Sequence, residues 1–299
     1  MAKNDKKAQP VPIEKPGKLT VAETKKAQLP SAGTIDFSAD AGHGQENVRA
    51  KDLLMPMIGL LQDMSPFVKK SEGAYIAGAE AGMLINTATH EIYEGDTGVL
   101  LVPCFYEAVL IEWVPRDNGG GLVKIYPDDD PIQKTTKRSP NSSTDKLPNG
   151  NDLVRTAQHY CLLVDEETGD FSRVVVPLSS TGLKKSRLWN SLADNIRLAR
   201  ADGTRYKPAS FSHLYRLTTV PEKNKKGSYF NVQPAVEGPV TDPALYAAAR
   251  EFYNMIAAGE IRAVPQRDEA AETTGASSGA DPITKPEPNT LDQGQKRPY

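Results

Sequence analysis

The chain has 299 residues, of which 36 are Lys or Arg and 38 are Asp or Glu, giving a formal net charge of −2. This near-neutral balance excludes a uniformly basic nucleic-acid coat protein of the histone type. No apolar run approaches the roughly 18–20 residues of a membrane-spanning helix, so no membrane partner is expected.

Both ends of the chain are predicted to be disordered tails. Residues 1–45 and 266–299 are rich in Lys, Ala, Pro, Ser and Gly, and their apolar residues are isolated. Such segments bury too little apolar surface to offset the entropy lost on ordering. The basic N-terminus also lacks the apolar stretch of a secretory signal. A single folded domain is therefore expected over 46–265.

The first half of this domain is predicted to consist mainly of strands. Apolar, β-branched runs at 98–102 and 108–114 indicate buried strands. Residues 128–152 are polar and rich in Pro, Ser, Asn and Lys, which predicts a flexible insertion between strands. Apolar runs at 159–164 and 171–177 flank an acidic turn with a glycine, and this pattern predicts a hairpin.

A central helix is predicted over 181–201, capped by the Ser and Thr residues that precede it. The expected apolar face of this helix consists of Leu188, Leu192, Ile196 and Ala199. A second helix should begin at Asp242 as N-cap, with Pro243 in the first turn, and should end at Gly259. Its expected apolar side consists of Leu245, Ala249, Phe252, Tyr253 and Ile256.

Between the two helices, an aromatic strand at 211–220 and a partner at 228–236 are joined by the turn NKKG. Strands and helices do not alternate along the chain, so the sequence gives no reason to expect parallel strands. The elements therefore predict an α+β fold: a small antiparallel barrel with a central and a C-terminal helix, flanked by the disordered tails.

Charge is distributed unevenly along the chain. Residues 51–130 contain five Lys or Arg against thirteen Asp or Glu, whereas residues 181–230 contain eleven against three. The basic stretch also contains aromatic residues. Positive charge attracts phosphates and releases counterions, and aromatic faces stack on bases at about 1–3 kcal/mol per base with little sequence preference. The combination predicts a surface that binds single-stranded nucleic acid.

The candidate binding residues lie on or beside the central helix and around the turn after the aromatic strand. The cations are Lys184, Lys185, Arg187, Arg197, Arg200, Arg216, Lys223, Lys225 and Lys226. The aromatic candidates are Trp189, Tyr215, Tyr229 and Phe230. For each of these residues the alternative interpretation is structural, because charge runs are usually solvated surfaces and strand aromatics are usually core residues.

Alternation along the strand separates some of these candidates. Tyr215 and Arg216 are adjacent, so they face opposite sides and only one of them can face DNA. Phe211 is favoured as a core residue, and Tyr229 or Phe230 as the residue that stacks beside the basic turn. If the central helix packs by its apolar face, Arg197 should point away from the core.

Three segments carry a family resemblance. They are LLQDMSPFV at 60–68, YEAVLIEWVPRDNGGG at 106–121, and FSHLYRLTTVPEKNKKG at 211–227 followed by Tyr229 and Phe230. Over about 45–262 the chain resembles single-stranded DNA-binding proteins of tailed bacteriophages that contain an oligonucleotide-binding barrel. The resemblance implies a five-stranded barrel with loop insertions that binds single strands across an open face.

The resemblance also implies a setting and partners. The expected function is sequence-tolerant binding of single-stranded DNA during phage replication or recombination, in the cytoplasm of the host cell. Further candidate partners are phage or host replication proteins and a second copy of the chain. Binders of this class commonly end in an acidic tail that recruits replication proteins, whereas this chain ends in Lys296–Arg297–Pro298–Tyr299.

Signatures of enzymes and of cofactor sites are weak, so no catalytic residue, metal or cofactor is predicted. No phosphate-binding loop or G-x-S-x-G nucleophile motif occurs. His159 and Cys161 share a strand face and could join Cys104 at a metal, but a buried thiol and an ordinary histidine are favoured. Two cysteines are also too few for a disulfide framework and indicate a reducing compartment.

Two alternative functions stay open at this point. The same helix and strands could form protein–protein contacts in a phage virion or scaffold protein. A metal-dependent nuclease could use 128–130 and Glu112 as carboxylate ligands. Salt-dependent binding to DNA would separate the first alternative from DNA binding, and Mg²⁺-dependent cleavage would identify the nuclease.

Overall fold

The computed structural model describes residues 37–49, 52, 54–115, 118, 120–138, 144–224 and 227–264. The chain divides into two compact units, Met1–Val48 and Arg49–Tyr299. In the first unit the described residues form the short 3-10 helix η1 (Phe37–Asp40) and a series of exposed turns. Apart from 37–45, the predicted tails lie outside the described residues.

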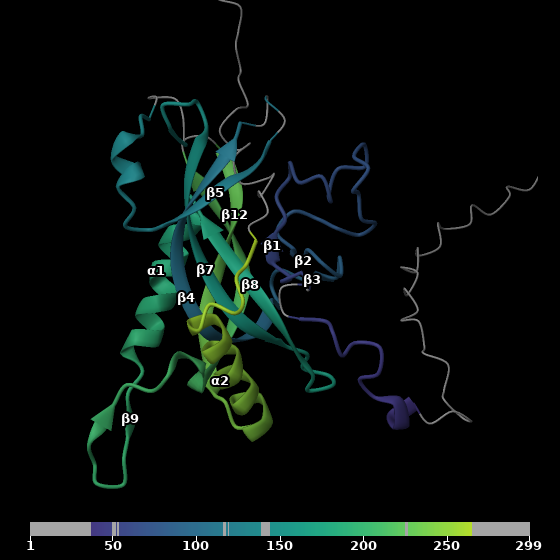
Figure 1. Cartoon of the computed structure of the whole chain (residues 1–299), viewed down its shortest axis with the longest axis vertical. Coiled ribbons are helices and arrows are strands. Elements are labelled where there is room, and N and C mark those ends of the chain that lie inside the picture. The colour runs from purple at the N-terminus through teal and green to yellow at the C-terminus, as the bar shows by residue number, and fades with distance from the viewer. Residues whose placement is uncertain are drawn as a thin grey trace, which may run out of the picture. The chain divides into compact units, whose positions relative to one another are not determined.

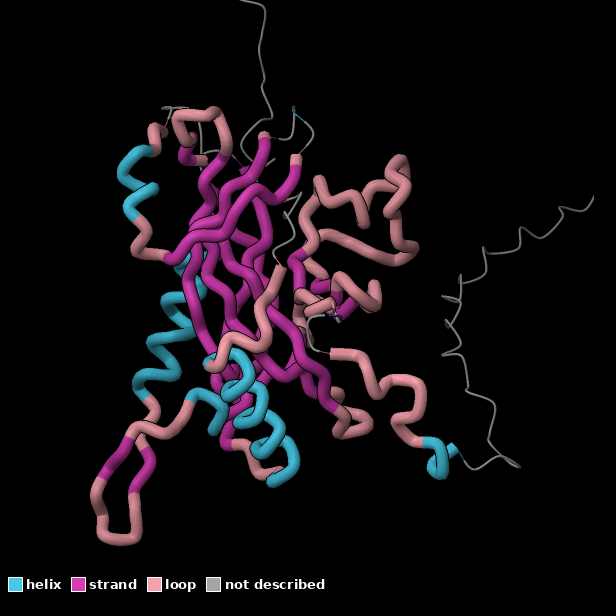
Figure 2. Tube along the Cα trace, in the orientation of Figure 1, coloured by secondary structure: helices cyan, strands magenta, loops and turns pink. Residues whose placement is uncertain are grey.

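The second unit is built on a seven-stranded antiparallel sheet, drawn in Figures 1 and 2. Its strands are β4 (Val99–Val114), β5 (Gly121–Pro127), β6 (Asp145–Lys146), β7 (Asp152–Val164), β8 (Phe171–Ser179), β11 (His213–Asn224) and β12 (Gly227–Pro239). The order is β12-β11-β4-β7-β6, with β5 also paired to β4 and β8 also paired to β7. Both predicted hairpins, β7–β8 and β11–β12, are confirmed.

Two smaller sheets and two helices complete this unit. The small sheets contain β1 (Ile58–Leu60), β2 (Leu84–Asn86) and β3 (Ile92–Tyr93), and β9 (Leu198–Ala199) with β10 (Arg205–Tyr206). The helices are α1 (Gly182–Asn195) and α2 (Pro243–Ala257), and short 3-10 turns are η4 (Pro131–Thr135) and η5 (Ser210–Ser212). The predicted α+β class with a central and a C-terminal helix is confirmed.

The predicted barrel is not confirmed, because the large sheet is open over the described residues. No ladder joins its edge strands β8 and β12. The chain around β1 lies between them instead: Met57 forms a single parallel bridge to Val175 on β8. On the other side, the buried Gln62 side chain bonds both the backbone N–H and C=O of Phe230 on β12, at 3.0 and 2.8 Å. One backbone bridge and one side-chain amide thus take the place of the ladder that would close a barrel.

The helices cover opposite faces of the sheet. Successive residues of β7 point to opposite faces. Cys161 packs in the cluster that contains Trp189 of α1, whereas Tyr160 packs in the cluster that contains Phe252 of α2. Because both faces are covered, β7 is buried along most of its length instead of alternating between buried and exposed residues.

The prediction for α2 is largely confirmed. The Asp242 carboxylate accepts the Ala244 N–H at 2.9 Å, and Pro243 is the first residue of the helix. The buried residues are Leu245, Ala249, Phe252 and Ile256, while Tyr253 is 39% exposed. Phe211 is buried in the same cluster beneath α2, as expected for a core residue. Gly259, with φ of +75°, follows the helix end.

The prediction for α1 needs correction at its end and on its face. The helix ends at Asn195, because Ile196 is extended and the chain turns into β9. Leu188 is 37% exposed and does not belong to the buried face. The buried residues of the helix are Gly182, Lys185, Ser186 and Trp189. Of the predicted face, Leu192 and Ile196 are partly buried against the core cluster of Trp189, whereas Ala199 is exposed. The rotation of α1 about its own axis is set by the ring contacts of Trp189 and the ion pair of Lys185, and it differs from the rotation that the spacing of the leucines predicted.

The predicted insertion at 128–152 lies between β5 and β7 and contains η4 and β6. Side-chain contacts attach it to the sheet in addition to the pairing of β6 with β7. Asp128 forms a two-pronged ion pair with Arg155, at 2.6 and 2.7 Å. The buried carboxylate of Glu112 accepts from Asn149 and Asn151 at 2.8 and 2.6 Å. Residues 139–143 lie outside the described residues, and the flexibility of the insertion stays a prediction.

A stack of two rings attaches α1 to the sheet. The Trp189 ring lies parallel to the ring of His159 on β7, with 4.4 Å between centroids and 9° between planes. His159 Nε2 and Ser186 Oγ are hydrogen-bonded at 2.8 Å. Burial lowers the pKa of His159 to about 3. The imidazole is therefore neutral in the folded protein at neutral pH.

We predict that this histidine makes the protein less stable as the pH falls. The unfolded chain takes up a proton near pH 6.5, whereas the folded chain does not until about pH 3. The free energy of unfolding should therefore decrease by about 2 kcal/mol between pH 7 and pH 5 from this group alone. Urea denaturation of wild type and His159→Phe at both pH values measures the difference.

In His159→Phe the decrease should be about 2 kcal/mol smaller. Part of the remaining decrease comes from His213, whose pKa is also lowered by burial. The matched control is His43→Gln in the first unit, which should keep the wild-type pH dependence because His43 is exposed. An identical pH dependence in wild type and His159→Phe would contradict the prediction.

Candidate nucleic-acid interface

The outward side of α1 carries exposed cations. With Trp189 and Ser186 fixed against the sheet, the residues at the complementary helical spacing face solvent: Lys184, Arg187, Leu188 and Ser191. Among the described residues, no carboxylate lies within ion-pair distance of Lys184 or Arg187. These two charges are therefore available to a ligand.

The β9–β10 hairpin continues this line of positive charge. Figure 1 shows that it extends past the end of α1, away from the sheet. We define the basic face as the exposed cations of α1 and of this hairpin region: Lys184, Arg187, Arg197, Arg200, Arg205 and Lys207. Tyr206 is half-buried in the hairpin, and the Arg200 guanidinium lies over its ring at 4.7 Å from the centroid.

Two exposed carboxylates, Asp194 and Asp202, partly offset the basic face. Asp194 forms an ion pair with Lys207, and Asp202 accepts from the Thr204 N–H and hydroxyl at 2.9 and 2.6 Å. Arg197 donates to backbone carbonyls at the end of α1, where a cation is favourable to the helix dipole. Six cations against two carboxylates leave the face positive.

Lys185 belongs to a buried network and not to the basic face. Its ammonium lies 2.9 Å from both the Glu222 carboxylate and the Gln233 side-chain oxygen. Glu222 also accepts from Tyr229 and Asn231 at 2.9 and 3.0 Å. The hydrogen bond from Lys185, followed by that from Asn231, lowers the pKa of Glu222 to about 2. The network joins the first turn of α1 to the β11–β12 hairpin.

Arg216 is also occupied by protein groups. Its guanidinium donates to both oxygens of Glu166 at 2.7 and 2.8 Å and lies 3.5 Å from Glu237. These partners, the Glu166 hydrogen bond first, raise its pKa. Its charge is compensated within the fold, which corrects its assignment as a phosphate contact.

Two aromatic candidates are core residues. Trp189 is 1% exposed and Tyr215 is 0% exposed, so neither ring presents a face to a base. Tyr215 and Arg216 do face opposite sides, as expected. The pairing of β11 with β12 shifts register between Leu214 and Tyr215. Phe211 and Tyr215 lie on opposite faces of the sheet: Phe211 packs in the cluster under α2, and Tyr215 packs in the cluster under α1.

The remaining candidates lie at the tip of the β11–β12 hairpin. Lys223 is exposed there, and Lys225 and Lys226 lie outside the described residues. The half-buried Phe230 ring packs against Gly82, since a Cβ built on that glycine would lie 2.7 Å from it. Tyr229 is half-buried, with its hydroxyl on Glu222.

Comparison with known proteins gives one match. Residues 24–262 match the family described as Pam3 phage gp34-like protein. The chain belongs to this phage protein family. No curated protein and no solved structure gives a significant match. The expected bacteriophage origin is thus confirmed, and the match ends at the same residue as the resemblance found in the sequence.

No described helix of this phage protein is long and apolar enough to span a membrane. The described carboxylates and thiols named as metal candidates are not brought together. Asp128 pairs with Arg155, and Glu112 accepts from Tyr126 at 2.6 Å as well as from two asparagines. Cys104 and Cys161 pack in clusters on opposite faces of the sheet.

Sequence reasoning did not place Arg205, Tyr206 and Lys207 at the site. The predicted helix continued to residue 201, which hid the β9–β10 hairpin. An available signal was Asp202–Gly203, a dipeptide typical of tight hairpin turns, with Gly203 at φ of +82°. Strands of only two residues are too short to show an apolar pattern of their own.

We predict that the neighbouring residues Lys184 and Lys185 differ sharply in their effect on stability. Lys185→Ala removes the ammonium from a network that is mostly buried, so it should lower the free energy of unfolding by about 2 kcal/mol. Lys184→Ala removes an exposed side chain and should change it by less than about 0.5 kcal/mol. Urea denaturation of both variants measures this. Equal effects would contradict the assignment of Lys185 to the structural network.

Proposed function

We propose that this phage protein binds single-stranded nucleic acid with little sequence preference, in replication or recombination, through the basic face. The observation that supports the proposal is the set of exposed cations on α1 and the β9–β10 hairpin region, in a chain whose net charge is −2. Such a local excess attracts phosphates and gains free energy by counterion release.

The rigidity of α1 supports this role. Its fourteen residues span about 21 Å, and the Trp189–His159 stack fixes its rotation. The Lys185–Glu222 network places the tip of β11–β12, with Lys223, beside its first turn. The exposed cations of α1 are therefore held at fixed spacings, which lowers the entropy lost on binding.

The position of Tyr206 favours single-stranded over double-stranded nucleic acid as the ligand. It is the aromatic ring within the basic face, and Arg200 already lies over it. Tyrosine rings and guanidinium planes both stack on unpaired bases. A duplex, in contrast, keeps its base faces covered. Of the carboxylates of the nuclease alternative, Asp128, Asp130 and Glu112 have protein partners. The virion or scaffold alternative becomes an outcome of the experiments below.

We predict that reversing charge on α1 weakens binding and reduces its dependence on salt. Lys184→Glu/Arg187→Glu should lower the affinity for a labelled oligonucleotide by about tenfold or more at low salt. The slope of log K against log salt should fall by about 0.7 for each lost phosphate contact, about 1.4 in all. Fluorescence anisotropy at several salt concentrations measures both quantities.

The matched control reverses Lys69 and Lys70, two cations of the segment between β1 and β2 that are not part of the basic face. This variant should keep the wild-type affinity and slope. If wild-type protein shows no salt-dependent binding, or if both double variants behave alike while folded, the proposal fails. Protein–protein contacts in a virion or scaffold would then be favoured.

We predict that Tyr206→Ala weakens binding without changing its salt dependence. Loss of one stacked base costs about 1–3 kcal/mol, and stacking releases no counterions. The same anisotropy titrations test this, with Tyr75→Ala as a control at a half-buried tyrosine outside the basic face. Wild-type affinity in Tyr206→Ala would show that the ring is not a stacking site.

A further inference from the structure

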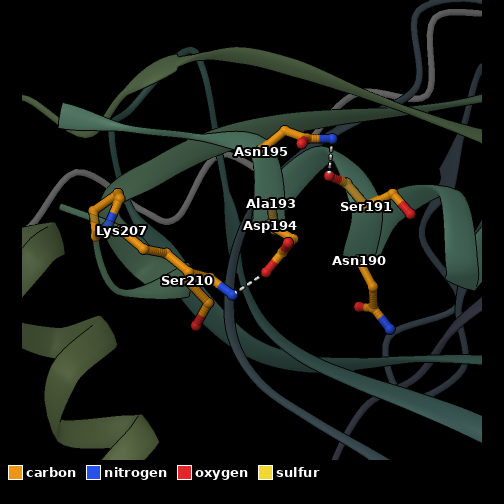
Figure 3. Close-up of a pocket in the computed structure, with 8 residues that line it drawn as sticks. Asn190, Ser191, Ala193, Asp194, Asn195, Lys207 and Ser210 are labelled. Carbon is orange, nitrogen blue, oxygen red and sulfur yellow. Dashed lines mark hydrogen bonds and ion pairs between the residues drawn. The ribbon is translucent and has the colours of Figure 1, made fainter. Parts of the chain in front are cut away.

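A groove of about 510 Å³ lies between the second half of α1 and the segment that leads into η5 (Figure 3). Its polar lining consists of Asn190, Ser191, Asp194, Asn195, Lys207 and Ser210. This volume is within the roughly 300–1,000 Å³ typical of small-ligand sites. Because Lys207 belongs to both, the groove adjoins the basic face.

The groove favours hydrogen-bond donors over phosphate. It lies at the C-terminal end of α1, where backbone carbonyls give the helix its negative pole. A hydrogen bond from Lys207 lowers the pKa of Asp194, which keeps this carboxylate ionised. The Asn195 Nδ2 is already used, since it donates to the Ser191 carbonyl at 2.9 Å. The oxygen of that amide therefore adds a further acceptor.

Asn190 supplies a group that can both donate and accept. It is half-buried, and Figure 3 draws no contact between its amide and the other lining residues. Positive charge lies beside these acceptors: Lys207 lines the groove and Arg197 lies just after the helix, and both are exposed. Acceptors and cations side by side match a nucleotide whose base meets the acceptors while its phosphates meet the cations.

We infer that this groove binds a nucleobase carrying an exocyclic amino group, from the single strand that the basic face holds. The inference rests on the proposed function and adds a base preference to it. Carboxylates accept from the amino group of cytosine, and asparagine amides pair with the donor and acceptor edge of adenine. Thymine presents a carbonyl oxygen in place of that amino group, and this oxygen would face the Asp194 carboxylate unfavourably.

The test compares oligo-dC and oligo-dT of equal length, both pyrimidine strands, by anisotropy at one salt concentration. Wild-type protein should bind oligo-dC about fivefold or more tightly than oligo-dT. Asn190→Ala and Asp194→Asn should each bring this ratio close to one. Asp194→Asn also frees Lys207 and should raise affinity for both strands, so the ratio is the quantity that decides.

The matched control is Asn254→Ala, at an exposed asparagine on α2, which should keep the wild-type ratio. Thermal unfolding of each variant establishes that it is folded. Equal wild-type affinities for the two strands, or a wild-type ratio in both groove variants, would overturn the groove inference and leave the proposed function standing. Absence of salt-dependent binding to either strand would overturn both.

Discussion

The parallel stack of Trp189 on His159 is the contact on which the arrangement of the surface depends. It joins the middle of α1 to the central strand pair of the sheet and sets which side of the helix faces inward. Once that rotation is fixed, Lys185 must enter the buried network with Glu222, while Lys184 and Arg187 must face solvent. One aromatic contact in the core thus determines which lysines of a basic run are available to a ligand.

The structure divides the cations of the basic stretch by their environment. Lys185 and Arg216 hold strands and helix together through carboxylate partners, whereas the basic face keeps its charge outside the core. Burying a cation is costly unless it is paired and hydrogen-bonded. The fold satisfies this by placing Glu222 beside the buried Lys185, while Glu166 pairs with the partly exposed Arg216. A count of positive residues along the chain therefore overstates the charge that a phosphate can contact.

The sequence predicts well those elements that carry their own local signals. The Asp242–Pro243 start of α2 and the acidic turn of the β7–β8 hairpin depend on neighbours in the chain, and both are confirmed. The end and the inward face of α1 depend instead on partners far away, such as His159, 30 residues before Trp189. The open sheet could not be anticipated either, because it depends on Gln62 taking the place of a strand opposite Phe230. For the site, the basic stretch and the exposed helix cations were found, but the hairpin that carries Tyr206 was not.

The side-chain closure at Gln62 has a mechanical consequence. A side-chain amide offers the same donor and acceptor as a peptide group. The Gln62 amide therefore takes the place of one residue of a neighbouring strand in the hydrogen bonding of Phe230. On the β8 side, the single bridge at Met57 does the same. Separating β8 from β12 along this line of contact breaks these few bonds and the hydrogen bonds that join Lys185 and Thr181 to β12, whereas separating β4 from β7 breaks a ladder of thirteen residue pairs. Local opening should therefore begin at the contacts of Met57 and Gln62 between β8 and β12. It would uncover the core beneath α1 while the central strands stay paired.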